Sequence, residues 1–124
     1  MLRIPSISTD PERKGDIRRA AEFVAGQLRQ AGLQNAGLID GQGHPLVYAE
    51  WTGAPGKPTL LFYGHYDVQP PDPLDEWTSP PFEPTLRGDD LFARGASDDK
   101  GQTMILIKAV EALLKTRGRL PVNV

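Results

Sequence analysis

The hydrophobic positions divide the chain into alternating helical and extended segments. Between Asp10 and Gly32, apolar residues recur every three or four positions opposite a charged face, which predicts an amphipathic helix. Asp10 is suited to cap this helix, Pro11 to occupy its first turn and Gly32 to end it. The apolar face consists of Ile17, Ala20, Ala21, Val24, Leu28 and Ala31.

Extended segments follow this helix. Leu46–Trp51 is a predicted strand after a glycine-rich turn. Thr59–Tyr63 is a continuous apolar run between a Gly-Lys-Pro turn and Gly64, which predicts a buried central strand. Leu91–Phe92 is a weaker strand candidate, and Leu120–Val124 begins another strand.

A second helix is predicted from about Lys100 to Lys115. It is apolar on nearly all sides, so we expect neighbouring elements to cover most of it. Helices that alternate with strands indicate an α/β fold, with a layered mixed or mostly parallel sheet and helices on its faces. Because the sequence stops inside the strand that begins at Leu120, we expect residues 1–124 to form an incomplete domain.

The composition excludes several classes of function. The chain has 124 residues, 14 Lys and Arg against 16 Asp and Glu, and a net charge of −2, so it lacks the basic excess of a nucleic-acid-binding protein. No apolar stretch approaches the roughly 18 residues of a membrane span, and the N-terminus lacks a signal-peptide core. We therefore expect a soluble, cytoplasmic protein without a membrane partner. With no cysteine, any metal site must use carboxylates and the two histidines, His44 and His65.

Several conspicuous residues have structural interpretations. His44 lies in a Gly-Gln-Gly-His-Pro turn, where a surface position is expected. Trp77 and Phe82 lie in a segment, Gln69–Pro84, that holds six of the twelve prolines, and they should anchor it over the core as an ordered loop. Arg94 is expected to pair with a carboxylate.

His65 and Asp67 directly follow the predicted buried strand. Strand ends in α/β sheets are where binding crevices form. Residues two apart in an extended chain project to the same face, so a metal-bound imidazole at His65 would have the Asp67 carboxylate beside it, to orient it or act with it. The alternative is a hydrogen-bonded histidine at a strand end with Asp67 as a turn former.

A second acidic cluster, Asp98–Asp99, immediately precedes the second helix. Carboxylates at a helix N-terminus are stabilised by the helix dipole, so Ser97 or Asp98 could be a simple N-cap. Alternatively, one carboxylate is a metal ligand held on rigid backbone. Lys100-Gly101 has the reverse order of a phosphate-binding Gly-Lys pair, and no nucleophile elbow surrounds Ser97.

Together these motifs resemble the M20 family of zinc metallopeptidases, in particular its dipeptidase and carboxypeptidase-like members. The resemblance extends over essentially the whole chain. The matching segments are Leu2–Ser8, Leu60–Pro70, Glu76–Pro84 and Arg94–Gly101. One departure is Phe92-Ala93-Arg94-Gly95, where the family often has Tyr-Gly-Arg-Gly.

The resemblance implies a role for each matching residue. His65 would ligate one zinc ion, and Asp98 would bridge two, because it and not Asp99 holds the family's position relative to Gly95. Asp67 matches the carboxylate that supports the histidine ligand, and it is our candidate catalytic residue. Asp99 is then expected in the first helical turn. A histidine and a carboxylate would also accommodate Mn²⁺ or Co²⁺.

The activity implied by the resemblance is metal-dependent hydrolysis of a peptide or amide bond by a water that two zinc ions activate. In the family a glutamate of a Glu-Glu pair is the general base. That pair and the remaining ligands match positions beyond Val124. We therefore expect the N-terminal part of a catalytic domain, without the rest of that domain or a lid domain, and no activity by this chain alone.

The implied substrates are dipeptides or short N-acyl amino acids. Two alternatives stay open: a non-catalytic scaffold or binding module that retains the fold, and a di-zinc deacylase of the same family. The resemblance also implies a possible homodimer in the full-length protein.

Overall fold

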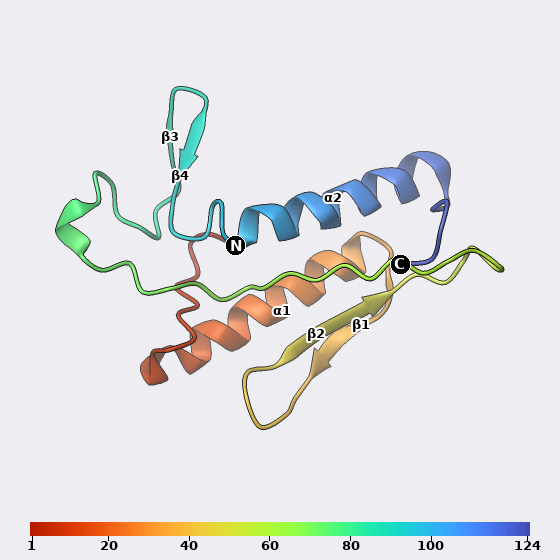
Figure 1. Ribbon diagram of the computed structural model, residues 1–124, viewed down its shortest axis with the longest axis horizontal. Coiled ribbons are helices and arrows are strands. Elements are labelled where there is room, and N and C mark those ends of the chain that lie inside the picture. The colour runs from red at the N-terminus through yellow and green to blue at the C-terminus, as the bar shows by residue number, and fades with distance from the viewer.

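A computed structural model describes all residues from 1 to 124, and Figure 1 shows its elements. Two long helices dominate the chain, accompanied by two short hairpins and two single turns of 3-10 helix. In chain order the elements are η1 (Pro11–Arg13), α1 (Lys14–Gln30), β1 (Gln34–Ile39), β2 (Leu46–Glu50), η2 (Leu74–Glu76), β3 (Thr85–Arg87), β4 (Asp90–Phe92) and α2 (Lys100–Arg117). Neither helix combines the length and apolar composition needed to cross a membrane.

The first predicted helix is confirmed. The Asp10 carboxylate accepts a hydrogen bond from the Glu12 amide at 2.9 Å, and the 3-10 turn η1 leads directly into α1. Gly32 has a φ of 95°, the positive value typical of the residue that follows a helix. The buried face of α1 lies against the β1–β2 hairpin and consists of Ile17, Ala20, Ala21, Val24 and Ala25.

The β1–β2 hairpin contains one predicted strand and one that the pattern does not predict. β2 matches the predicted strand, and it pairs antiparallel with β1 in a register that places Gly37 opposite Tyr48. The β1 sequence, QNAGLI, has few β-branched or aromatic residues, so its strand propensity is low. Pairing with β2 and contact with α1 therefore determine the conformation of β1.

The prediction that Thr59–Tyr63 is a buried central strand is wrong. The segment forms no strand, and Leu61 and Tyr63 are 90% and 86% exposed. Its only bridge is a parallel contact between Thr59 and Asn123, and Leu120–Val124 is likewise no regular strand. A strand requires partners along its edges, and this chain supplies only residues near Asn123. The apolar run indicates that these residues prefer a buried position, but it does not indicate which segment would cover them.

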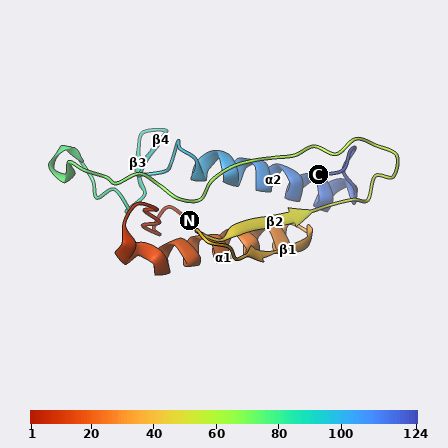
Figure 2. The same cartoon turned by 60° about the horizontal axis from the view of Figure 1, so that its bottom comes forward.

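The second helix lies where the sequence predicts it, but it is not largely covered. Its buried residues are Lys100, Ile107 and Val110, whereas Ile105 is 68% exposed. Figure 2 shows why: α1 and the β1–β2 hairpin form one layer, while α2 lies in a second layer with little beyond it. A mostly apolar groove of about 680 Å³ lies between α2, β2 and the exposed Leu60–Tyr63 stretch.

The α/β class is confirmed, with the strands arranged as two separate antiparallel pairs, β1–β2 and β3–β4. Leu91–Phe92 falls in β4, as predicted. Parallel alignment is confined to two isolated bridges, one between Thr59 and Asn123 and one between Ile7 and Val68. The second bridge joins the N-terminal segment to the residues that follow His65.

Candidate metal centre

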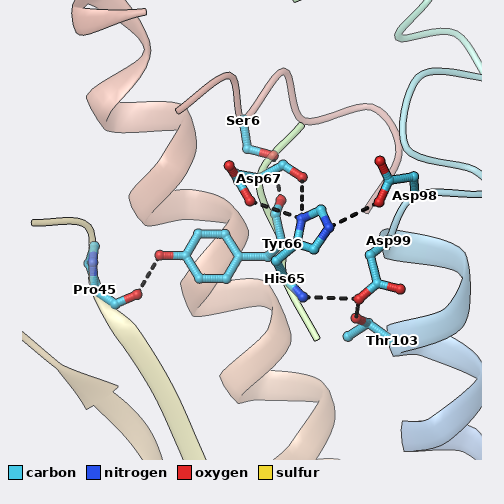
Figure 3. A network of polar contacts seen from close by, with 8 residues as sticks. All are labelled: Ser6, Pro45, His65, Tyr66, Asp67, Asp98, Asp99 and Thr103. Carbon is cyan, nitrogen blue, oxygen red and sulfur yellow. Dashed lines mark hydrogen bonds and ion pairs between the residues drawn. The ribbon is translucent and has the colours of Figure 1, made fainter. Parts of the chain in front are cut away.

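The structure brings His65, Asp67 and Asp98 together (Figure 3). The His65 Nδ1 atom lies 2.9 Å from Asp67 Oδ1, and its Nε2 atom lies 3.0 Å from Asp98 Oδ1. His65 and Asp67 follow the extended stretch, whereas Asp98 precedes α2, 33 residues further along the chain. One imidazole thus has a carboxylate at each ring nitrogen, and the two carboxylates come from different segments.

Asp99 fixes the backbone beside this contact, a role that the sequence does not predict. Its Oδ2 atom accepts hydrogen bonds from the His65 amide at 3.0 Å and from the Thr103 hydroxyl at 3.1 Å. Asp99 stands at the N-cap position of α2 but makes no capping hydrogen bond with its side chain. The simple N-cap interpretation of Asp98 is also wrong, because its carboxylate faces His65. The two adjacent carboxylates therefore have different contacts. Asp98 faces the His65 ring, whereas Asp99 accepts a hydrogen bond from the His65 backbone amide.

Close backbone packing explains the glycines around the centre. A Cβ atom on Gly64 would lie 2.5 Å from Thr103 Oγ1, and one on Gly101 would lie 2.1 Å from the Ala96 carbonyl oxygen. Real Cβ atoms do not approach other atoms so closely. Only glycine therefore allows the His65 segment and the loop before Asp98 to lie directly against the first turns of α2.

Among the groups with displaced pKa values, His65 and Lys100 bear on this centre. Burial lowers the pKa of His65, but the hydrogen bonds with Asp98 and Asp67 outweigh it, so the pKa lies above its ordinary value. Burial also lowers the pKa of Lys100, to about 8, against the opposing effect of the Asp67 and Asp16 charges. The imidazolium form of His65 is thus stabilised by the two carboxylates that face it.

The donor set fits a divalent metal ion such as zinc. Two ligands bound to one tetrahedral zinc ion at about 2.0–2.2 Å stand roughly 3.3–3.6 Å apart. His65 Nε2 and Asp98 Oδ1 are at a hydrogen-bond distance of 3.0 Å, so a separation of a few tenths of an ångström would admit the ion between them. When Nδ1–H donates to Asp67, the Nε2 lone pair is available to a metal. Asp98 is 80% exposed, so its second oxygen is accessible to another ion. No group of three or more His, Cys, Asp or Glu side chains is arranged to hold a metal. The metal-related roles of His65, Asp67 and Asp98 therefore stay a prediction.

The other conspicuous residues lie away from this centre. His44 is exposed in its turn, as predicted, with Nε2 3.0 Å from the Ser8 carbonyl oxygen. Trp77 is partly buried and donates to the Pro71 carbonyl at 2.7 Å, which ties down the proline-rich loop. The prediction that Arg94 pairs with a carboxylate is wrong. The Arg94 guanidinium donates to the Pro70 carbonyl and lies 5.3 Å from the Trp77 ring centroid.

The fold and site together define an α/β protein with a histidine–carboxylate centre beside a helix N-terminus. Comparison with known sequences identifies its family: the pattern described as "Peptidase family M20/M25/M40" matches residues 61–124, just over half of the chain. The chain belongs to this peptidase family.

Known relatives agree with this membership. The chain is 34% identical over 129 residues to the Beta-Ala-His dipeptidase of Rattus norvegicus, a match that covers 96% of this chain and 26% of that protein. It is 52% identical over 95 residues to the succinyl-diaminopimelate desuccinylase of Aromatoleum aromaticum, covering 77% of this chain and 24% of that protein. The structure superposes on the M20 family metallo-carboxypeptidase Sso-CP2 from Sulfolobus solfataricus with a TM-score of 0.88 and 42% identity, covering 98% of this chain and 27% of that one. The chain spans about a quarter of the length of these relatives.

Proposed function

We propose that this chain supplies part of a di-zinc centre that hydrolyses a peptide or amide bond in dipeptides or short N-acyl amino acids. The observation that carries the proposal is the placement of the His65 imidazole between Asp67 and Asp98. Family membership supports the hydrolytic chemistry, and the names of the relatives, a dipeptidase and a metallo-carboxypeptidase, support small peptide substrates and a metal.

Each residue of the centre has a distinct role in this proposal. Asp67 accepts the Nδ1 proton of His65, which fixes the tautomer and directs the Nε2 lone pair toward the metal. Asp98 supplies an exposed carboxylate that two cations can share. Asp99 holds the His65 backbone against α2, so the imidazole does not need to reorient on binding. When bound, zinc lowers the pKa of a water molecule and polarises the scissile carbonyl.

The centre formed by these residues is incomplete as a catalytic site. A catalytic zinc requires about three protein ligands, and a general base must take the proton of the attacking water. This chain offers two ligands in contact and no group of three. We propose that the remaining ligands and the base lie outside residues 1–124, and that this chain alone is inactive. Metal-dependent, EDTA-sensitive dipeptide hydrolysis by the purified chain would contradict this.

Removal of an acyl group from an N-acyl amine is the second candidate function. The 52% identity to a desuccinylase over 95 residues favours it, since the same metal centre can serve either amide. The full-length protein can distinguish the two. A dipeptidase should have at least a tenfold higher kcat/KM on dipeptides than on N-succinyl diamino acids, and a desuccinylase the reverse.

Calorimetric titration of the chain with zinc tests the proposed ligands. We expect weak binding that His65→Ala and Asp98→Ala both abolish. His44→Ala is a matched control, because His44 is an exposed histidine outside the centre, and its removal should leave the zinc affinity unchanged. Binding that survives both ligand substitutions, or no binding by the wild-type chain, would count against a preformed pair of ligands here.

A further inference from the structure

Lys100 is the only charged residue that is buried, with 1% of its surface exposed. It is the first residue of α2 and lies two positions after Asp98. Burying an ammonium group is costly unless hydrogen bonds and opposite charges compensate it. A buried lysine at this position therefore requires specific partners, and none of the proposed ligand roles accounts for it.

The partner of Lys100 is the N-terminal segment. Its Nζ atom donates to the Ile4 carbonyl oxygen at 2.7 Å, and the negative charges of Asp67 and Asp16 act on the same ammonium. Its stem lies so close to Gly95 that a Cβ atom there would be 3.2 Å from Lys100 Cδ. In Figure 1 the N-terminus accordingly lies beside the first turn of α2.

The same N-terminal segment is bound to the backbone that carries His65 and Asp67. The buried Ser6 hydroxyl donates to the Tyr66 carbonyl at 2.7 Å, and the Ser6 carbonyl accepts from the Val68 amide at 2.8 Å. Ile7 forms a parallel bridge with Val68. Residues 4–7, which we name the N-terminal strap, thus contact α2 at one end and the His65 segment at the other.

We propose that the N-terminal strap, held by Lys100 at one end and by Ser6 at the other, positions His65 relative to Asp98. Lys100 and Ser6 are positioning residues and bind no metal themselves. Asp98 moves with the first turn of α2, and His65 and Asp67 move with Tyr66 and Val68, so the strap fixes one half of the centre against the other. A neutral side chain at position 100 would remove the hydrogen-bond donor to the Ile4 carbonyl oxygen and release that end of the strap from α2.

This inference rests on the proposed metal site only where it predicts an effect of the strap on zinc affinity. Its structural part is tested on the metal-free chain by NMR, with Lys100→Met, Ser6→Ala and the control Lys108→Met, which removes an exposed lysine of the same helix. The readouts are amide exchange at Val68 relative to Val24 in α1, the ¹⁵N shifts of the His65 ring, and zinc affinity.

We expect Lys100→Met to speed Val68 exchange about tenfold relative to Val24, shift the His65 ring signals, and weaken any zinc binding by at least about tenfold. Ser6→Ala should act in the same direction, and Lys108→Met should leave the Val68-to-Val24 exchange ratio, the His65 ring signals and the zinc affinity unchanged. Unchanged Val68 exchange and ring signals in folded Lys100→Met would overturn the inference. Should that variant fail to fold, the same null result in Ser6→Ala would overturn it. Absence of zinc binding by the wild type would refute the proposed ligands without affecting the strap, because the exchange and ring signals require no metal.

Discussion

Replacing Gly101 by alanine tests whether the start of α2 lies as close to the loop before Asp98 as the structure shows. The added Cβ atom would meet the Ala96 carbonyl oxygen at 2.1 Å, and that oxygen belongs to the backbone and cannot rotate away. Relieving the overlap requires a backbone shift, which typically costs about 1–3 kcal/mol. Alanine favours a helix over glycine by about 1 kcal/mol, so we expect a net destabilisation of up to about 2 kcal/mol.

Gly26 provides the matched control for this substitution. It lies within α1, and a Cβ atom there would meet nothing within 4 Å. Gly26→Ala should therefore stabilise the chain by about 0.5–1 kcal/mol through helix propensity alone. Urea unfolding followed by helical circular dichroism, with equal m values, measures both changes. A Gly101→Ala chain as stable as Gly26→Ala would refute the close approach, and with it the rigid placement of Asp98.

Three further predictions concern the centre, the core and the surface. Asp67→Asn should weaken zinc binding about 10–100-fold without unfolding the chain, because it removes the charged acceptor of the His65 ring; an unchanged calorimetric affinity would remove Asp67 from the site. Ile17→Ala should lower the urea-unfolding free energy by about 2–5 kcal/mol, because Ile17 is only 1% exposed. Leu61→Ala should change the same free energy by less than about 0.5 kcal/mol, because Leu61 is 90% exposed. Hydrogen bonds from two lysines lower the pKa of Glu111 to about 2, so its contribution to stability is present above pH 4.5 and is lost as the pH falls toward 2. The wild type should thus lose more stability than Glu111→Gln over this range, and high salt should reduce the difference because both lysine side chains are exposed; a pH dependence that is equal in both chains would refute the ion pairing.

Local sequence signals account for the helices. Asp10 and Pro11 mark the 3-10 turn that leads into the first helix, through side-chain capping and a fixed φ angle, and Gly32 marks the end of that helix through a positive φ angle. These effects operate within a few residues, so they can be inferred without the tertiary structure. By contrast, the apolar run Thr59–Tyr63 describes a preference for burial that only another segment can satisfy. Whether this run forms a strand cannot be predicted from its own residues, because pairing depends on partners elsewhere in space.

The residues of the candidate site also fall into two groups, those that the sequence predicts and those that it does not. The spacing of His65 and Asp67 predicts their shared face, and the family resemblance brings in Asp98 from 33 residues away. Asp99 and Lys100 escaped prediction because their partners are backbone groups: the His65 amide and the Ile4 carbonyl. Backbone groups are the same at every residue, so the sequence contains no signal that identifies which one a side chain will reach.

The exposed stretch Leu60–Tyr63 has a consequence for proteolysis. Proteases bind their substrates in extended conformations, and accessible chain without regular hydrogen bonding is cut first. This stretch forms no helix or strand, and its four residues are between 45% and 90% exposed. Chymotrypsin, which prefers aromatic and leucine residues, should therefore cleave between Leu60 and Tyr63 well before it cuts either helix. The cut would separate α1 and its hairpin from His65, and protection from it would report any segment that comes to cover this strip.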